Sequence, residues 1–234
     1  MKRAAVLALL LAAGLPAATI QFVSIEGFLH YGGSTAPQAA FNSSSPEFTS
    51  FLDANNLGVF QFVWTNTTGI AIDNLTFTLF LDPDIDRDDN TYFNEYGEFL
   101  SNLLPILAPS GAFTFTDWEI DEPEYTFGNI YTHANEAALD NTSGVPASGP
   151  VDDVSQAMLF RVGQLLPGQT LTVAGTLSLT DAAGLGHYDP DSDVSLYVNG
   201  YATLSDAPTS GVPEPATAAL VAAATLAAVL IRRK

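Results

Sequence analysis

Cysteine is absent from the 234-residue sequence, and basic residues are nearly absent from its interior. Without cysteine, the chain forms neither a disulfide framework nor a thiolate metal site. Between residues 19 and 211 only Arg87 and Arg161 are basic, against 25 of the 26 acidic residues. Such a surface repels nucleic-acid phosphates, so nucleic acid is excluded as a partner, and it attracts divalent cations. The alternative interpretation is that the charge only keeps an exported protein dispersed.

Sequence signatures of common enzymes are missing as well. The chain has no Gly-x-Ser-x-Gly, no His-Glu-x-x-His and no phosphate-binding glycine loop. His30, His133 and His187 lie far apart without ligand spacing, and we interpret them as structural or exposed. A carboxylate pair for glycoside hydrolysis needs a defined geometry, which abundant acidic residues alone do not supply. We therefore expect a protein that is not an enzyme, with a secreted hydrolase as the least favoured alternative.

The first 18 residues have the layout of a secretory signal peptide. Lys2 and Arg3 form a positive segment, residues 4–15 are apolar, and Pro16 is followed by two alanines. We therefore expect export, with the signal peptide removed near Ala18.

The C-terminus combines a proline-bounded motif, an apolar run and a basic tip. Residues 216–231 are apolar apart from Thr217 and Thr225, and at about 1.5 Å per residue they span about 24 Å, less than a hydrocarbon core of about 30 Å. The basic tip extends this reach and favours the cytoplasmic side of the membrane. The sequence predicts a transmembrane helix over 216–231, stopped by Arg232, Arg233 and Lys234.

This ending resembles the PEP-CTERM sorting signal of Gram-negative bacteria, also called the ice-binding protein C-terminal domain. The resemblance covers residues 212–234 and is carried by Val212, Pro213, Glu214 and Pro215, followed by the apolar run and the basic tip. It implies that an exosortase processes a precursor held transiently in the inner membrane. It also implies a final place at the cell surface or outside the cell, in proteins associated with exopolysaccharide and biofilm. Two prolines keep the motif extended, as a protease groove requires.

The body, residues 19–204, shows the period-two hydrophobic alternation of β-strands. Its fold class is predicted to be all-β, an antiparallel β-sandwich that is Ig-like or jelly-roll-like, because threonine and serine occupy the faces opposite the apolar residues. Residues 205–211 read as a linker to the tail. The strand candidates are IQFVSIEGF, VFQFVWT, NLTFTLFLD, AFTFTDW, AMLFRV, TLTVAGTLSLT and VSLYVNGYATL.

Four local features add detail to this fold. Apolar residues in 93–104 and the composition of 132–141 each indicate a short helix. Asn199-Gly200 is typical of a tight hairpin turn, and Gly175 of a β-bulge.

The most distinctive internal stretch is DPDIDRDDNTYFNE, residues 82–95. Oxygen-bearing side chains occur there at the spacing of a calcium-binding loop, on Asp84, Asp86, Asp88, Asn90 and Glu95. Asp89 stands where an EF-hand needs glycine, and the flanks are not two helices. We therefore expect Ca²⁺ bound in a loop of the β-sandwich, and the alternative is a solvated acidic turn.

Two further acidic runs are weaker. Asp189, Asp191 and Asp193 repeat the alternating spacing in a shorter stretch. Glu119 alternates with Asp117 and Asp121, which places three carboxylates on one face of a strand, and we expect water to solvate them.

These observations favour a structural protein of the cell surface or extracellular matrix. The alternative is a calcium-dependent carbohydrate-binding or adhesin-like module, which needs exposed tryptophan or tyrosine beside the 82–95 loop. Trp64 and Trp118 are expected in the core rather than on such a surface.

Overall fold

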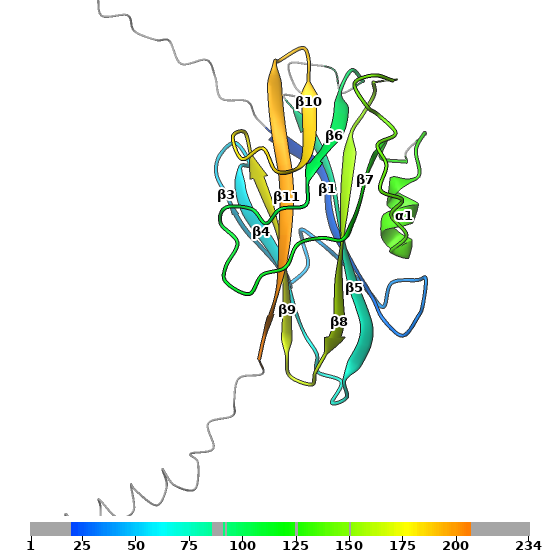
Figure 1. Ribbon diagram of the computed structural model, residues 1–234, viewed down its shortest axis with the longest axis vertical. Helices are drawn as coiled ribbons and strands as arrows, with labels where there is room; N and C mark the ends of the chain where they lie inside the picture. The colour runs from blue at the N-terminus through cyan, green and yellow to red at the C-terminus, as the bar shows by residue number, and fades with distance from the viewer. Residues whose placement is uncertain (1–19, 86–90, 92, 125, 150, 207–234) are drawn as a thin grey trace, which may run out of the picture.

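The computed structural model shows two antiparallel β-sheets packed face to face, as expected for an all-β sandwich (Figure 1). It describes residues 20–85, 91, 93–124, 126–149 and 151–206. The predicted signal peptide, the sorting motif, the predicted transmembrane helix 216–231 and the basic tip lie outside these residues, as do Asp86, Asp88 and Asn90. Within the described part, no helix is both long enough and apolar enough to cross a membrane.

The first sheet has five strands in the order β2-β1-β5-β8-β7, and every neighbouring pair is antiparallel. Its longest strand, β5, alternates polar and apolar residues, yet it is buried without interruption from Phe77 to Ile85, because α1 covers part of the outer face and the second sheet covers the inner face. The strands are β1 (Ile20–His30), β2 (Ala39–Asn42), β5 (Ile72–Ile85), β7 (Asp117–Asp121) and β8 (Ser155–Leu165).

The second sheet has six strands in the order β3-β4-β9-β11-β10-β6, again antiparallel throughout. Its strands are β3 (Phe48–Leu52), β4 (Gly58–Thr65), β6 (Tyr96–Ser101), β9 (Thr170–Ser178), β10 (Gly184–Asp189) and β11 (Val194–Ser205). Strand β11 ends at Ser205 opposite Thr170, and Thr170 follows the loop after Leu165. Leu165 pairs with Ile72, so this is the opposite end of the sandwich from Ile85.

The core lies between the sheets and is rich in phenylalanine. Phe77 contacts Phe41 and Phe62 with ring centroids 6.1 and 5.8 Å apart, which joins the two inner faces. Each fully buried side chain of this size contributes about 1.5–3 kcal/mol. Trp64 and Trp118 are partly buried against this core, as the sequence predicts.

One helix, α1 (Ile130–Glu136), covers the outer face of the first sheet. Ile130 and Ala134 are fully buried there against Phe28, Phe80 and Leu159. Tyr131 adds edge-to-face contacts with Phe28 and Phe80. The helix ends at Ala137, whose left-handed φ of 54° reverses the chain. A helix within 132–141 is therefore confirmed, although it begins two residues earlier than the predicted range.

Three local predictions are wrong. Residues 96–101 of the predicted helix 93–104 form strand β6, because pairing with β10 overrides the local apolar spacing. Asn199-Gly200 lies inside β11 rather than in a turn. The β9–β11 pairing is unbroken at Gly175, where a Cβ atom would lie 2.2 Å from the Phe60 ring, so this glycine makes room for a ring rather than forming a bulge.

Candidate metal-binding site

Four buried carboxylates gather at the end of the sandwich where β5 ends and β8 begins. Asp82 and Asp84 lie near the C-terminal end of β5. Glu95 directly precedes β6, and Asp153 precedes β8. Their exposed fractions are 1 %, 2 %, 0 % and 9 %. We call these four residues the acidic end cluster. Acidic side chains are seldom this buried unless a charge partner compensates for the loss of water.

Asp153 shows how strongly these carboxylates repel one another. Burial, followed by the negative charges of Asp82, Asp84 and Glu95, raises its pKa to about 8. Among the described residues, no donor reaches its Oδ1 atom, and only a backbone hydrogen bond favours the ionised form. Asp153 is therefore a carboxyl group that needs either a proton or a nearby cation at neutral pH.

Glu95, which directly precedes β6, is held in place by a histidine from the neighbouring strand β10. His187 Nε2 lies 2.6 Å from Glu95 Oε2, and both side chains are fully buried. The second carboxylate oxygen, Oε1, accepts a long hydrogen bond of 3.5 Å from the Ile85 amide. A histidine that fixes the orientation of a carboxylate is a common second partner in metal sites.

Two buried polar residues begin β8, and one of them contacts the cluster. Ser155 Oγ donates a 2.7 Å hydrogen bond to Asp82 Oδ1 across the β5–β8 pair. The next residue, Gln156, is fully buried, and neither its amide oxygen nor its amide nitrogen has a partner within the described part of the chain. Because successive side chains of a strand point to opposite faces, Gln156 faces away from Asp82 and is not part of the acidic end cluster.

A pocket of about 360 Å³ opens beside the acidic end cluster. Phe93 and Phe127 line it with exposed fractions of 58 % and 65 %. Carboxylates of Glu122, Asp152 and Asp153 line the same pocket. Burial and the charges of Asp152 and Asp121 raise the pKa of Glu122. The pocket therefore combines apolar rings with acidic groups that favour a proton or a cation.

The structure brings together only part of the predicted calcium loop. Asp84 and Glu95 both act on Asp153, whereas Asp86, Asp88 and Asn90 lie outside the described residues. Sequence spacing left out Asp82, although Asp82 opens the same stretch, and it missed Asp153 and His187, which come from other parts of the chain. The pair of acids at 152–153 just before an apolar strand was the available signal. In the acidic run 189–193, Asp189 instead caps the β10–β11 turn, where it accepts a 2.9 Å hydrogen bond from the Asp191 amide.

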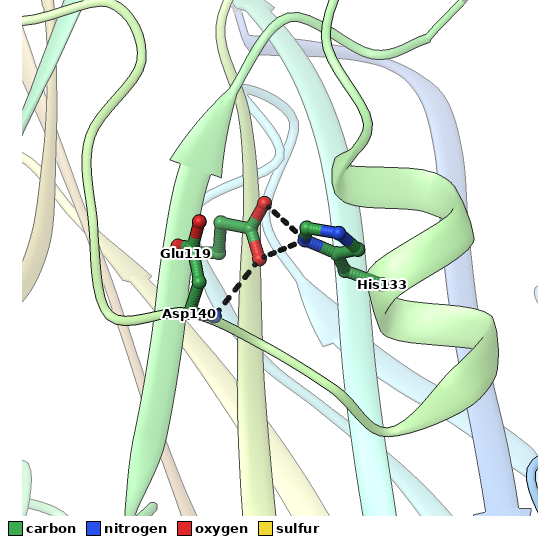
Figure 2. Close-up of side chains that lie close together, drawn as sticks. All are labelled: Glu119, His133 and Asp140. Carbon is green, nitrogen blue, oxygen red and sulfur yellow. Dashed lines mark hydrogen bonds and ion pairs between the residues drawn. The ribbon is translucent and has the colours of Figure 1, made fainter.

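A second group of ligand-type side chains lies under α1, and we call it the helix cluster (Figure 2). It consists of Glu119 on β7, His133 on α1 and Asp140 in the following loop. His133 Nδ1 lies 2.9 Å from both carboxylate oxygens of Glu119. The Asp140 amide donates a 3.2 Å hydrogen bond to Glu119 Oε2.

The predicted solvation of Glu119 is wrong, because its exposed fraction is 1 %. Burial raises the pKa of Glu119 despite the opposing hydrogen bond from His133. Burial alone would lower the pKa of His133, but the hydrogen bond and charge of Glu119 outweigh it and the pKa is raised. The contact between His133 and Glu119 therefore offsets part of the cost of burying each side chain.

Comparison with protein-family models, curated proteins and solved structures finds no match to this chain.

Proposed function

We propose that this chain is an exported, non-enzymatic protein of the cell surface or extracellular matrix, whose β-sandwich is stabilised by Ca²⁺ bound at the acidic end cluster. The observation that carries the calcium site is that three buried carboxylates, those of Asp82, Asp84 and Glu95, act on the fourth, Asp153. The tail sequence at 212–234 supports export, a membrane-spanning helix and exosortase processing. Association with exopolysaccharide or biofilm rests on the same resemblance.

Ca²⁺ suits this cluster by its chemistry. It takes six to eight oxygen ligands in flexible geometry, and the cluster offers carboxylates from three separate segments of the chain. An ion there cancels the repulsion that now raises the pKa of Asp153. Because the ligands come from β5, the β6 side and the β8 side, the ion links both sheets at one end.

The test is thermal unfolding of the full chain, purified in detergent, with EDTA or with millimolar CaCl₂. We expect Ca²⁺ to raise the melting temperature by several degrees, in the way any ligand specific to the folded state does. Asp84→Asn should abolish most of this gain. Glu136→Gln removes an exposed carboxylate from α1 and should retain it. An unchanged melting temperature of the wild-type chain would eliminate the calcium site.

Processing is tested separately. Replacing Pro213, Glu214 and Pro215 with alanine should leave an uncut precursor in the membrane fraction of a host that has the exosortase. A matched replacement of Thr209, Ser210 and Gly211 should be processed normally. If the first variant were cut like the wild type, the tail would act only as an anchor.

A second candidate function, calcium-dependent carbohydrate binding, is favoured by the aromatic pocket. Exposed Phe93 and Phe127 beside Asp152 and Asp153 provide apolar rings next to an acidic site. Sugar rings pack on aromatic faces, and carboxylates or a bound cation hold their hydroxyl groups. The observation that favours this function is therefore the shared position of Asp153 in the cluster and in the pocket.

Glycan-array binding with Ca²⁺ and with EDTA tests this second function. A positive result requires a glycan signal that EDTA removes and that Phe127→Ala abolishes at unchanged melting temperature. Phe51→Ala, which truncates an exposed ring on β3, should keep the signal. Absence of any calcium-dependent glycan signal would leave the structural role alone.

A further inference from the structure

The helix cluster differs in chemistry from the acidic end cluster because it contains a nitrogen ligand. One ligand atom each from Glu119, His133 and Asp140 lies within 4.8 Å of the other two. Figure 2 shows the imidazole facing the Glu119 carboxylate, with Asp140 on the other side of that carboxylate. One imidazole and two carboxylates suit Zn²⁺ and related transition metals, whereas Ca²⁺ prefers oxygen alone.

The hydrogen bonds of His133 place its proton on Nε2, which leaves the Nδ1 lone pair able to bind a cation. Its Nε2 atom lies 3.2 Å from the Asn129 amide, and the hydrogen bonds are satisfied when the amide oxygen accepts from Nε2–H. The amide nitrogen then donates to Asp121 Oδ2 at 3.2 Å and to Glu119 Oε1 at 3.3 Å. With Nε2 protonated, a neutral imidazole presents its Nδ1 lone pair to a carboxylate. Two acceptor atoms at this distance repel each other unless a proton or a metal ion lies between them.

The surroundings hold the ligands as metal sites require. Asn129 fixes the ring orientation of His133 from the side opposite the carboxylate. Thr142 donates two hydrogen bonds to Asp140 Oδ1, at 3.0 Å from its amide and 2.6 Å from its hydroxyl. Glu119 receives the Asp140 amide at 3.2 Å. All three ligands are therefore positioned by groups other than the ion.

The His133–Glu119 distance needs little adjustment, whereas the ligand atom of Asp140, which lies within 4.8 Å of the other two, moves inward to reach a shared ion. Tetrahedral Zn²⁺ ligands at about 2.0–2.1 Å from the metal lie about 3.3 Å from one another. The His133–Glu119 contact of 2.9 Å must therefore open by a few tenths of an ångström. His133 is 24 % exposed and Glu119 is 2 % exposed at the side chain, so solvent reaches the cluster from the histidine side. Water can then complete the coordination as a fourth ligand.

We propose that Glu119, His133 and Asp140 bind one Zn²⁺ ion, with Nδ1 of His133 and one oxygen from each carboxylate as ligands. Two carboxylates balance the two charges of the ion. The site ties β7, α1 and the loop after α1 together, so the metal fixes the helix on the outer face of the first sheet. It is separate from the proposed calcium site and does not depend on it.

Isothermal titration of ZnCl₂ into the EDTA-treated, dialysed full chain in detergent tests this site, with millimolar CaCl₂ present to fill oxygen-only sites. We expect one Zn²⁺ per chain. His133→Gln and Glu119→Gln should each weaken binding about 10-fold or more, the scale expected even for loss of an outer partner. Glu136→Gln lies on the same helix, is exposed, and should bind like the wild type. Co²⁺ should give a visible absorption band that His133→Gln loses.

Two results would overturn the proposal. One is Zn²⁺ binding that His133→Gln and Glu119→Gln leave unchanged, because the ion would then be held elsewhere on the acidic surface. The other is no Zn²⁺ binding by the wild-type chain, which would make the helix cluster an ion pair only. If either variant at a buried position fails to fold, Asp140→Asn decides the outcome, because Asp140 is exposed and its loss leaves the core intact.

Discussion

Glu95 and His187 meet 2.6 Å apart inside the sandwich, and neither side chain has any exposure to solvent. His187 belongs to β10 of the second sheet, and Glu95 also contacts the Ile85 amide at the end of β5 in the first sheet. The pair therefore joins the two sheets through polar contacts at the end where the carboxylates gather.

Breaking this pair should strongly destabilise the fold. His187→Ala leaves a buried carboxylate without its partner, and we expect it to lower the free energy of unfolding by about 3–5 kcal/mol. Chemical denaturation of the wild type and the variant measures this loss. The double variant Glu95→Gln, His187→Ala should lose less than the sum of the losses of Glu95→Gln and His187→Ala measured alone, because each single change leaves one group unpaired. If the loss in the double variant equalled the sum of the single losses, Glu95 and His187 would not stabilise each other.

Asp153→Asn should have opposite effects with and without calcium. At pH 8 in EDTA, the variant removes a repelled carboxylate and should gain about 1–3 kcal/mol of stability, the cost of a poorly compensated buried polar group. In millimolar CaCl₂ it should lose the gain that the wild type shows, because a ligand is missing. Urea unfolding of both proteins in EDTA and in CaCl₂ measures the difference in the free energy of unfolding under each condition. A variant less stable than the wild type in EDTA would refute the repulsion.

The calcium-free protein should become less stable as pH rises. The pKa of Asp153 is about 8 in the folded protein and near 3.8 when unfolded, so the folded state holds its proton more tightly. Its contribution is complete below about pH 4 and is lost progressively up to about pH 8. Urea unfolding of the wild type and Asp153→Asn between pH 5 and 8 isolates this contribution as the difference between the two slopes. Equal slopes for the two proteins would show that Asp153 does not titrate between pH 5 and 8.

Gly175→Ala should destabilise the core by about 1–3 kcal/mol, because the new methyl group would overlap the Phe60 ring. Denaturation of Gly175→Ala, with and without Phe60→Leu, measures the effect. The smaller leucine should recover part of the loss in the double variant. Gly33→Ala is a poor control because φ there is 74°, whereas Thr172→Ser at a half-buried position of the same strand removes one methyl group away from the Phe60 ring.

Period-two alternation predicted the strands that carry the core, because their pattern is set by burial on each side of a sheet. It located β1, β4, β5, β8, β9 and β11. It missed β6 because Tyr96, Phe99 and Leu100 also fit a helical face, and only pairing with β10 distinguishes the two. It misread Gly200 because a glycine near asparagine is typical of a turn, whereas here the absent Cβ makes room for Phe160.

The candidate sites were predicted only where their residues are close in sequence. Asp84 and Glu95 share one short stretch, so spacing was enough to select them. Asp153 and His187 reach the same place from β8 and β10, and no local pattern records that proximity. Glu119 was expected to be solvated because the helix that buries it follows it in sequence and covers its strand only in three dimensions.

Strand β11 ends at the opposite pole of the sandwich from Ile85. The fourteen residues of β5 between these poles span about 45 Å at about 3.3 Å per residue. If the chain is held by the segment after Ser205, its carboxylate-rich tip stands about that far from the surface that holds it. Ions and glycans in the surrounding medium would then reach this tip first, before they reach the base of the molecule.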